Sequence, residues 1–382
     1  MGIQLFRPTF HIYECLEEIK ECLDKGWTGL GFKTVEIENK WNEYTGHKCS
    51  HFINSDTVGL HLAVKILKLV NNWSNEDEII TTPITFISTN HAILYENLIP
   101  RFADVDDHLC LDPEDVKKKI NSKTRAIMFV GYGGRVGQLE KIIEICKDNN
   151  LKLILDAAHM SGTRMNGIFP GTLDGVDVAV YSYQAVKNLP TGDSGMICFA
   201  KKEHDEICRK LTWLGINKDT YTRTNLATGN YKWKYDVEYV GYKYHGNSIM
   251  AAIALTQLKY LDNDNDYRRS LASYYDELLT GHEKIKIIDA PYKNECSYHI
   301  YAIEVDNRDG LTEKLNKNDI YAGVHYIDNT EYKMYSYDSG KCPNAHRVSN
   351  HIISLPLHLQ LTKRDIEKIA NVVIGFVENK SY

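Results

Sequence analysis

The run Tyr181-Ser182-Tyr183-Gln184-Ala185-Val186-Lys187 follows an apolar stretch and leads into a loop rich in glycine and proline. Upstream, the apolar stretch 151–155 ends in Asp156-Ala157-Ala158-His159. An acid at the end of one predicted strand is thus followed, after the next apolar stretch, by a serine and a lysine. Since open α/β sheets bind ligands at the carboxyl ends of their strands, we expect these three side chains to meet there.

An acid, a serine and a lysine in this order suit the chemistry of pyridoxal phosphate (PLP). The amine of Lys187 would form a Schiff base with the cofactor aldehyde, and Asp156 would keep the pyridine nitrogen protonated so that the ring acts as an electron sink. An isolated lysine in such a loop is usually a solvated surface charge. Ser182 and Asp156 favour the catalytic interpretation, so Lys187 is the predicted catalytic residue.

Length, charge and cysteine usage limit the class of protein. The chain has 382 residues, enough for a large core and two domains. Its net charge of -6, without a basic block, argues against nucleic acid as a partner. The nine cysteines include no CxxC pair, which favours reduced thiols in a cytoplasmic protein over a disulfide framework or a metal site. We find neither a signal peptide nor a membrane span.

Short apolar strands alternate with amphipathic helices in the first part of the chain. We predict strands at 52–55, 78–83, 99–105, 126–130, 151–155 and 176–180, and helices at 58–67, 112–120 and 141–148. Such alternation with short connections predicts an α/β fold with a mostly parallel sheet covered on both faces.

The pattern changes near Gly241. We predict helices at 247–261, 267–279 and 311–315, strands at 298–305 and 321–326, and a final helix at 362–377 with Thr362 as its N-cap. We therefore expect a large PLP-binding domain over 1–266 and a smaller C-terminal α/β domain over 267–382. The pattern leaves open which domain the segment 9–24 packs against.

Four further features fit the cofactor. A helix N-terminus is the best site for its phosphate, and Asn54-Ser55-Asp56-Thr57 supplies such a turn, with the Ser182 hydroxyl as a further donor. Phe86 could stack on the pyridine ring, and His159 could hydrogen-bond the phenolic oxygen. Taken alone, each has an ordinary structural interpretation as an N-cap cluster, a core aromatic or a structural histidine.

The set of motifs resembles the DegT/DnrJ/EryC1/StrS family of PLP-dependent nucleotide-sugar aminotransferases, across nearly the whole chain. The resemblance rests on Asn54-Ser55-Asp56-Thr57, Thr82-Pro83-Ile84-Thr85-Phe86, Phe102-Ala103-Asp104-Val105, Asp156-Ala157-Ala158-His159, Ser182 to Lys187, Gly192-Asp193-Ser194-Gly195, Gly241-Tyr242-Lys243-Tyr244-His245, Val324-His325-Tyr326 and Ser354-Leu355-Pro356-Leu357-His358.

The resemblance implies PLP fold-type I, the aspartate aminotransferase-like fold, in a homodimer with an active site at each subunit interface. Lys187 would carry the cofactor and Asp156 would face the pyridine nitrogen. The cofactor-binding residues would be Asp56, Thr57, Phe86, Asp156, His159, Ser182, Lys187 and, reaching across from the partner subunit to the phosphate, Lys243.

The implied reaction is a ping-pong transamination. Glutamate would convert the cofactor to pyridoxamine phosphate, which would pass the amine to the keto group of a nucleotide-linked deoxysugar, with Lys187 moving the proton in both halves. A 4-keto-6-deoxyhexose is the acceptor most common in the family, and a 3-keto sugar is the alternative. The product would be an amino sugar of O-antigens, lipopolysaccharide or other surface glycans.

Three positions depart from the family pattern. His159 stands where glutamine is frequent, Lys243 where asparagine is common, and Leu214-Gly215 where a His-Gly pair is frequent. The last segment lines the sugar pocket in relatives, so the resemblance does not fix the sugar.

Three other functions are weighed against this interpretation. A PLP-dependent sugar dehydratase of this fold typically lacks the Schiff-base lysine, whereas Lys187 is present. A cofactor-free regulatory dimer would not need the intact set of acid, serine and lysine. A nicotinamide enzyme is excluded because Gly131-Tyr132-Gly133-Gly134 lacks the GxGxxG spacing.

Overall fold

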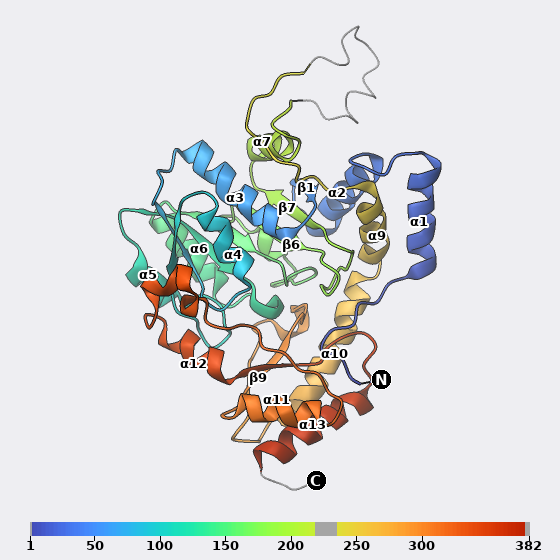
Figure 1. The fold of residues 1–382 in the computed structure, drawn as a ribbon, viewed down its shortest axis with the longest axis vertical. Coiled ribbons are helices and arrows are strands. Elements are labelled where there is room, and N and C mark those ends of the chain that lie inside the picture. The colour runs from blue at the N-terminus through green and yellow to red at the C-terminus, as the bar shows by residue number, and fades with distance from the viewer. Residues whose placement is uncertain (1, 218–234, 379–382) are drawn as a thin grey trace.

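A seven-stranded sheet forms the centre of the molecule in the computed structural model, which describes residues 2–217 and 235–378 (Figure 1). The strand order is β1-β7-β6-β5-β4-β2-β3. β7 runs antiparallel to both its neighbours and the other pairs are parallel, as predicted. The strands are β1 (Cys49–Ile53), β2 (Glu78–Thr81), β3 (Ile99–Phe102), β4 (Thr124–Val130), β5 (Lys152–Asp156), β6 (Val178–Ser182) and β7 (Gly195–Phe199).

Helices cover both faces of this sheet because its strands are apolar on both sides. In β4, Ala126 and Met128 pack with α3 and α7, whereas Ile127 and Phe129 belong to the core that includes α2, α6 and α9. A strand buried on two faces has a continuous rather than an alternating apolar pattern. The helices are α2 (Phe32–Thr45), α3 (Asp56–Asn71), α4 (Ile87–Leu94), α5 (Pro113–Lys119), α6 (Leu139–Asp148), α7 (Lys202–Thr212) and α9 (Ser248–Leu258).

A second, antiparallel sheet lies at the lower end of the molecule in Figure 1. Its strands, in the order β10-β9-β8, are β8 (Lys286–Ile287), β9 (Tyr301–Glu304) and β10 (Ile352–Leu355). The predicted N-cap Thr362 is confirmed, since its side chain accepts a hydrogen bond from the Asp365 N–H. The surrounding helices are α10 (Leu261–Leu279), α11 (Arg308–Asn316), α12 (Pro343–His351) and α13 (Lys363–Val377).

The predicted boundary at residue 266 falls inside α10, which runs from the large sheet towards the small one (Figure 1). The division into domains stays a prediction, and its stretches 218–234 and 379–382 lie outside the described residues. The N-terminal helix α1 (Ile12–Asp24) packs on α9, where the Gln257 side chain accepts from the His11 N–H and donates to the Thr9 carbonyl.

The prediction of a strand over 321–326 is wrong. Gly323 makes an isolated bridge to Ser354, and the chain then turns towards the large sheet. The Tyr132 hydroxyl, rather than a neighbouring strand, donates to the His325 carbonyl. Apolar residues in this stretch line a cavity instead of a sheet face, which explains why their pattern misled the sequence analysis.

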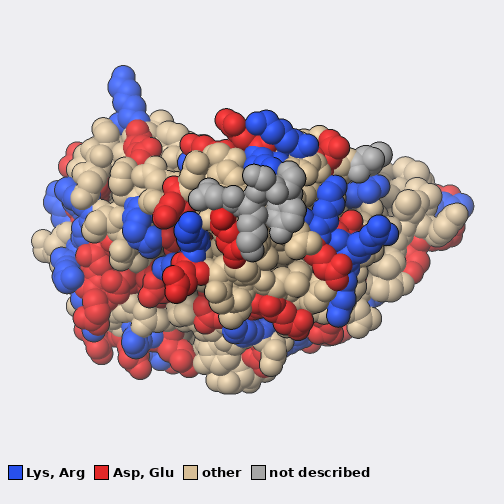
Figure 2. Space-filling model, turned by 90° about the horizontal axis from the view of Figure 1, so that it is seen from below, with Lys and Arg blue, Asp and Glu red and all other residues tan. Residues whose placement is uncertain are grey.

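The face seen in Figure 2 carries acidic and basic side chains interspersed with one another, in keeping with the modest net charge of -6. Among the described helices, none is both long and apolar enough to cross a membrane.

Gly195 lies where β7 approaches the N-terminus of α3, at the carboxyl edge of the parallel strands. It opens β7 and pairs with Ser182 on one side and Ile53 on the other. A Cβ at this position would lie 2.7 Å from the Tyr181 carbonyl oxygen and 3.1 Å from the Asp56 nitrogen. Because both obstacles are backbone atoms, only glycine lets the strand lie against the N-terminus of α3.

We predict that Gly195→Ala weakens PLP binding by about tenfold, since the added methyl group displaces the backbone of the predicted phosphate site. Titration of the apo-protein with PLP measures this. Gly192→Ala is the matched control, because there a Cβ would meet only the flexible Met250 side chain. Equal affinities for the two variants would contradict the prediction.

Candidate active site

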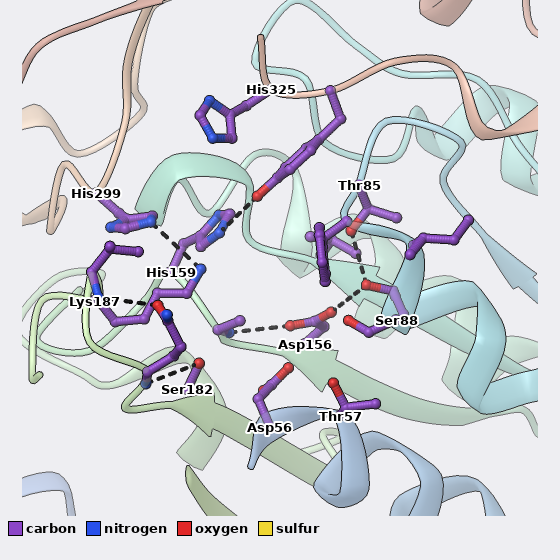
Figure 3. Close-up of a pocket in the computed structure, with 18 of the residues that line it drawn as sticks. Asp56, Thr57, Thr85, Ser88, Asp156, His159, Ser182, Lys187, His299 and His325 are labelled. Carbon is purple, nitrogen blue, oxygen red and sulfur yellow. Dashed lines mark hydrogen bonds between the residues drawn. The ribbon is translucent and has the colours of Figure 1, made fainter. Parts of the chain in front are cut away.

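A cavity of about 680 Å³ lies at the carboxyl ends of β4, β5 and β6, whose last residues Val130, Asp156 and Ser182 line it (Figure 3). The structure brings seven of the eight predicted cofactor residues into this cavity. They are Asp56, Thr57, Phe86, Asp156, His159, Ser182 and Lys187.

Lys187 lies in the turn between β6 and β7, where its N–H donates to the Gln184 carbonyl. Burial lowers the pKa of its amine to about 8, although the carboxylates of Asp56 and Asp156 oppose this shift. At pH 7 about a tenth of the amine is therefore unprotonated. Such a lysine can act as a nucleophile and as a base, which a solvated lysine cannot do efficiently.

Asp156 is held in a fixed orientation at the end of β5. One carboxylate oxygen accepts from the Thr89 hydroxyl at 2.7 Å and the other from the Ala158 N–H at 3.1 Å. Burial raises the pKa of this carboxyl, since only 3 % of the residue is exposed, while the two hydrogen bonds and the Lys187 charge lower it. A cation placed opposite Asp156 would stabilise its charged form further.

The N-terminus of α3 forms the wall beside Asp156. Ser55 caps the helix by accepting from the Val58 N–H, and the first turn, which begins at Asp56 and Thr57, lines the cavity. A helix N-terminus favours an anion, because the first N–H groups of a helix have no partner within the helix. Burial, with help from the charge of Asp156, raises the pKa of Asp56 well above its usual range.

The proton of His159 can be assigned from its partners. The Gly133 N–H donates to Nδ1 at 3.2 Å, so the neutral ring carries its proton on Nε2, which lies 3.2 Å from the Tyr326 hydroxyl. Burial lowers the pKa of His159 well below its usual range, and the Lys187 charge adds to this. His159 is thus a neutral donor at the cavity wall, and its predicted contact with the cofactor phenolic oxygen stays a prediction.

Two of the predicted cofactor residues, Phe86 and Lys243, are less buried in the cavity or lie outside it. Phe86 is 60 % exposed and lies at the cavity surface, with its ring 6.3 Å from that of Tyr326. Lys243 lies outside the cavity of its own chain, with its ammonium 3.2 Å from the centre of the Trp213 ring. Its predicted role needs a second subunit and stays a prediction.

The sequence analysis missed other residues of the cavity. His299, His325 and Tyr326 were noted only as parts of predicted strands or motifs, and Phe6 was not noted at all. Phe6 stacks on His299 with 5.1 Å between ring centres, although the two residues lie far apart in the sequence. No local pattern could have paired these rings; only the motif Val324-His325-Tyr326 gave a signal.

The described residues fit PLP. The Lys187 amine and the carboxyls of Asp56 and Asp156 face the same cavity, yet among the described residues no carboxylate forms an ion pair with Lys187. One oxygen of Asp56 is buried without a hydrogen-bond partner. Charges held apart around a cavity leave room for a ligand with a carbonyl, a ring cation and an anionic group.

Residues 11–374 match the model of the DegT/DnrJ/EryC1/StrS aminotransferase family. The chain belongs to this family. It is accordingly a PLP-dependent aminotransferase of fold-type I. The match covers both sheets and the whole cavity wall apart from Phe6.

Individual relatives are similar over their full length. The spore coat polysaccharide biosynthesis protein SpsC of Bacillus subtilis is 29% identical, over 96% of this chain and 95% of its own. The aminotransferase TlmJ of Streptoalloteichus hindustanus is 28% identical with a TM-score of 0.90, covering 100% of both chains. The sugar aminotransferase CalS13 of Micromonospora echinospora is 26% identical with a TM-score of 0.88, covering 98% of this chain and 99% of its own.

We predict that Thr89→Val weakens PLP binding by about tenfold, because Asp156 loses a hydrogen bond that favours its charged form. Thr89→Ser retains the hydroxyl and is the matched control. Equilibrium titration of both apo-variants with PLP measures the difference. A valine variant that binds PLP as tightly as the serine variant would refute this role of Thr89.

Proposed function

We propose that this aminotransferase moves the amino group of glutamate to the keto group of a nucleotide-linked deoxysugar, a 4-keto-6-deoxyhexose in the first instance. The observation that carries the proposal is the meeting of Lys187, Asp156 and the N-terminus of α3 in one cavity. Family membership supports the amino transfer. The name of CalS13 supports a sugar as the acceptor, and that of SpsC supports a polysaccharide as its destination. We propose that this polysaccharide is an O-antigen or another surface glycan.

Lys187 attaches the cofactor and then acts as the base. When bound, PLP supplies an electron sink that makes the hydrogen on the amine-bearing carbon acidic. The freed Lys187 amine would take this proton and deliver it to the cofactor carbon bound to the same nitrogen, and its pKa of about 8 leaves it able to do both near neutral pH. Asp156, fixed by Thr89 and the Ala158 N–H, would hold the positive ring nitrogen.

The first turn of α3 and the Ser182 hydroxyl would anchor the phosphate. Phe86 would cover one face of the ring, and His159 would donate from Nε2 to the phenolic oxygen. Lys243 would complete the phosphate site from a second subunit, so the proposal includes a homodimer with shared active sites. We also propose that the protein has two domains, 1–266 and 267–382, and that it is located in the cytoplasm.

The mouth of the cavity suits a sugar. Phe86, Ile327 and Tyr332 line the cavity and are also exposed, at 60, 38 and 42 %. Aromatic faces bind the apolar faces of sugars and bases by packing, and a tyrosine hydroxyl adds a polar contact. Ile327 and Tyr332 are therefore proposed to receive the acceptor, next to the Phe86 ring.

We predict that Lys187→Ala abolishes turnover, because Lys187 is the one lysine among the described residues that line the cavity. The wild-type protein should show the absorbance band of a lysine-linked PLP, and glutamate should replace it with that of pyridoxamine phosphate. The variant should lack the lysine-linked band. Lys118→Ala, at an exposed lysine outside the cavity, is the control. Near-normal turnover of Lys187→Ala would overturn the mechanism.

We predict that the glutamate-treated enzyme regains the lysine-linked band only with a nucleotide-linked keto sugar. A panel of 4-keto-6-deoxy and 3-keto sugars on GDP, UDP and dTDP measures this by absorbance and by the mass of the product. A response to the 3-keto sugars alone would show that the acceptor is a 3-keto sugar, the alternative to the proposed 4-keto sugar. A response only to keto acids would contradict the sugar proposal altogether.

A further inference from the structure

His299 is buried directly beside Lys187. Only 4 % of this residue is exposed, and its ring is fixed between two others, stacked on Phe6 and 4.5 Å from the ring of His159. The backbone N–H of His299 donates to the Gly133 carbonyl, which ties the residue to the turn after β4. The imidazole is therefore held in one place and can present only one ring nitrogen to the lysine.

Asn188 determines which nitrogen of His299 carries the proton. The Asn188 amide nitrogen donates to Asn265 Oδ1 and to the Ser297 carbonyl, both at 2.7 Å. With both donors used, the Asn188 oxygen must accept, and it lies 3.1 Å from His299 Nδ1. His299 therefore carries its proton on Nδ1 and leaves the lone pair of Nε2 free.

The free lone pair faces the catalytic amine. His299 Nε2 lies 3.5 Å from Lys187 Nζ, at the outer limit of a hydrogen bond (Figure 3). Catalytic hydrogen bonds are often this long before the ligands bind. We propose that His299 is a positioning residue, which accepts a hydrogen bond from the Lys187 ammonium whenever this lysine is free of the cofactor. The inference rests on the proposed role of Lys187.

The charges around Lys187 explain why a neutral acceptor is useful. Asp56 from α3 and Asp156 from β5 attract the ammonium towards the floor of the cavity. Burial lowers the pKa of His299 well below its usual range, and the charge of Lys187, the rings of His159 and His325 and the guanidinium of Arg268 on α10 act in the same direction. His299 therefore does not take the proton from Lys187.

A hydrogen bond from the ammonium to His299 has two consequences. It favours the charged form of Lys187, so it keeps the pKa of the lysine from falling as far as burial alone would drive it. It also holds the amine on the His299 side of the cavity, ready to return the proton, instead of leaving it to approach Asp156. Both consequences are measurable without the sugar acceptor.

Two substitutions test the contact of His299 Nε2 with Lys187 separately from that of Nδ1 with Asn188. His299→Asn keeps a donor for Asn188 but is too short to reach Lys187, whereas His299→Gln can place its carbonyl oxygen near the position of Nε2. In the apo-proteins, the pH dependence of Lys187 labelling by an amine-reactive reagent, read by peptide mass spectrometry, gives the lysine pKa. We expect His299→Asn to lower this pKa by about one unit and His299→Gln to stay near the wild type.

Kinetics of the glutamate half-reaction give a second readout. His299→Asn should lower the rate at saturating glutamate about tenfold, with little change in KM, and shift the pH profile by the same pKa change. His299→Gln should restore most of the rate. Equal lysine pKa values in the wild type and the asparagine variant would overturn the inference, whichever way the rates fall.

The same experiments distinguish a failure of this inference from a failure of the proposed role of Lys187. If Lys187→Ala retains the lysine-linked band, the role of Lys187 itself is wrong. If that band is lost but His299→Asn leaves the lysine pKa unchanged, only the role of His299 is wrong. Thermal melting of each variant confirms that the compared proteins are folded.

Discussion

The burial of one lysine at the carboxyl edge of a parallel sheet is the constraint on which the rest of this site depends. Removing an ammonium from water is costly unless opposite charges or hydrogen-bond acceptors lie near it. Here the carboxyls of Asp56 and Asp156 supply the opposite charge without forming an ion pair with Lys187. The lysine thus keeps a pKa of about 8 and remains chemically available, whereas an ion-paired amine would stay charged.

The two imidazoles near this lysine each carry their proton on one defined ring nitrogen. Gly133 fixes the proton of His159 on Nε2, and Asn188 fixes that of His299 on Nδ1. Burial keeps both imidazoles neutral. Burial lowers the pKa of the Lys187 amine to about 8, so this amine can carry the reacting proton near neutral pH.

Local patterns predicted six of the seven strands of the large sheet and missed β7. They succeeded where a strand buried on both faces is a continuous apolar run that ends in a polar residue. Asp156 and Ser182 follow such runs, and Lys187 follows them within the next turn. The patterns failed where contacts join distant segments. The stacking of Phe6 on His299 and the bend at Val324 to Tyr326 depend on how the two sheets meet, which no local period encodes.

The central claim, that Lys187 alone carries the cofactor, is tested most directly by borohydride reduction of the PLP-loaded protein followed by peptide mass spectrometry. Reduction makes the link between lysine and cofactor permanent, so the modified residue can be read from the fragment masses. The account predicts the cofactor mass on Lys187 in the peptide after β6 and on no other lysine. Modification of Lys243 or of surface lysines, with Lys187 unmodified, would contradict it.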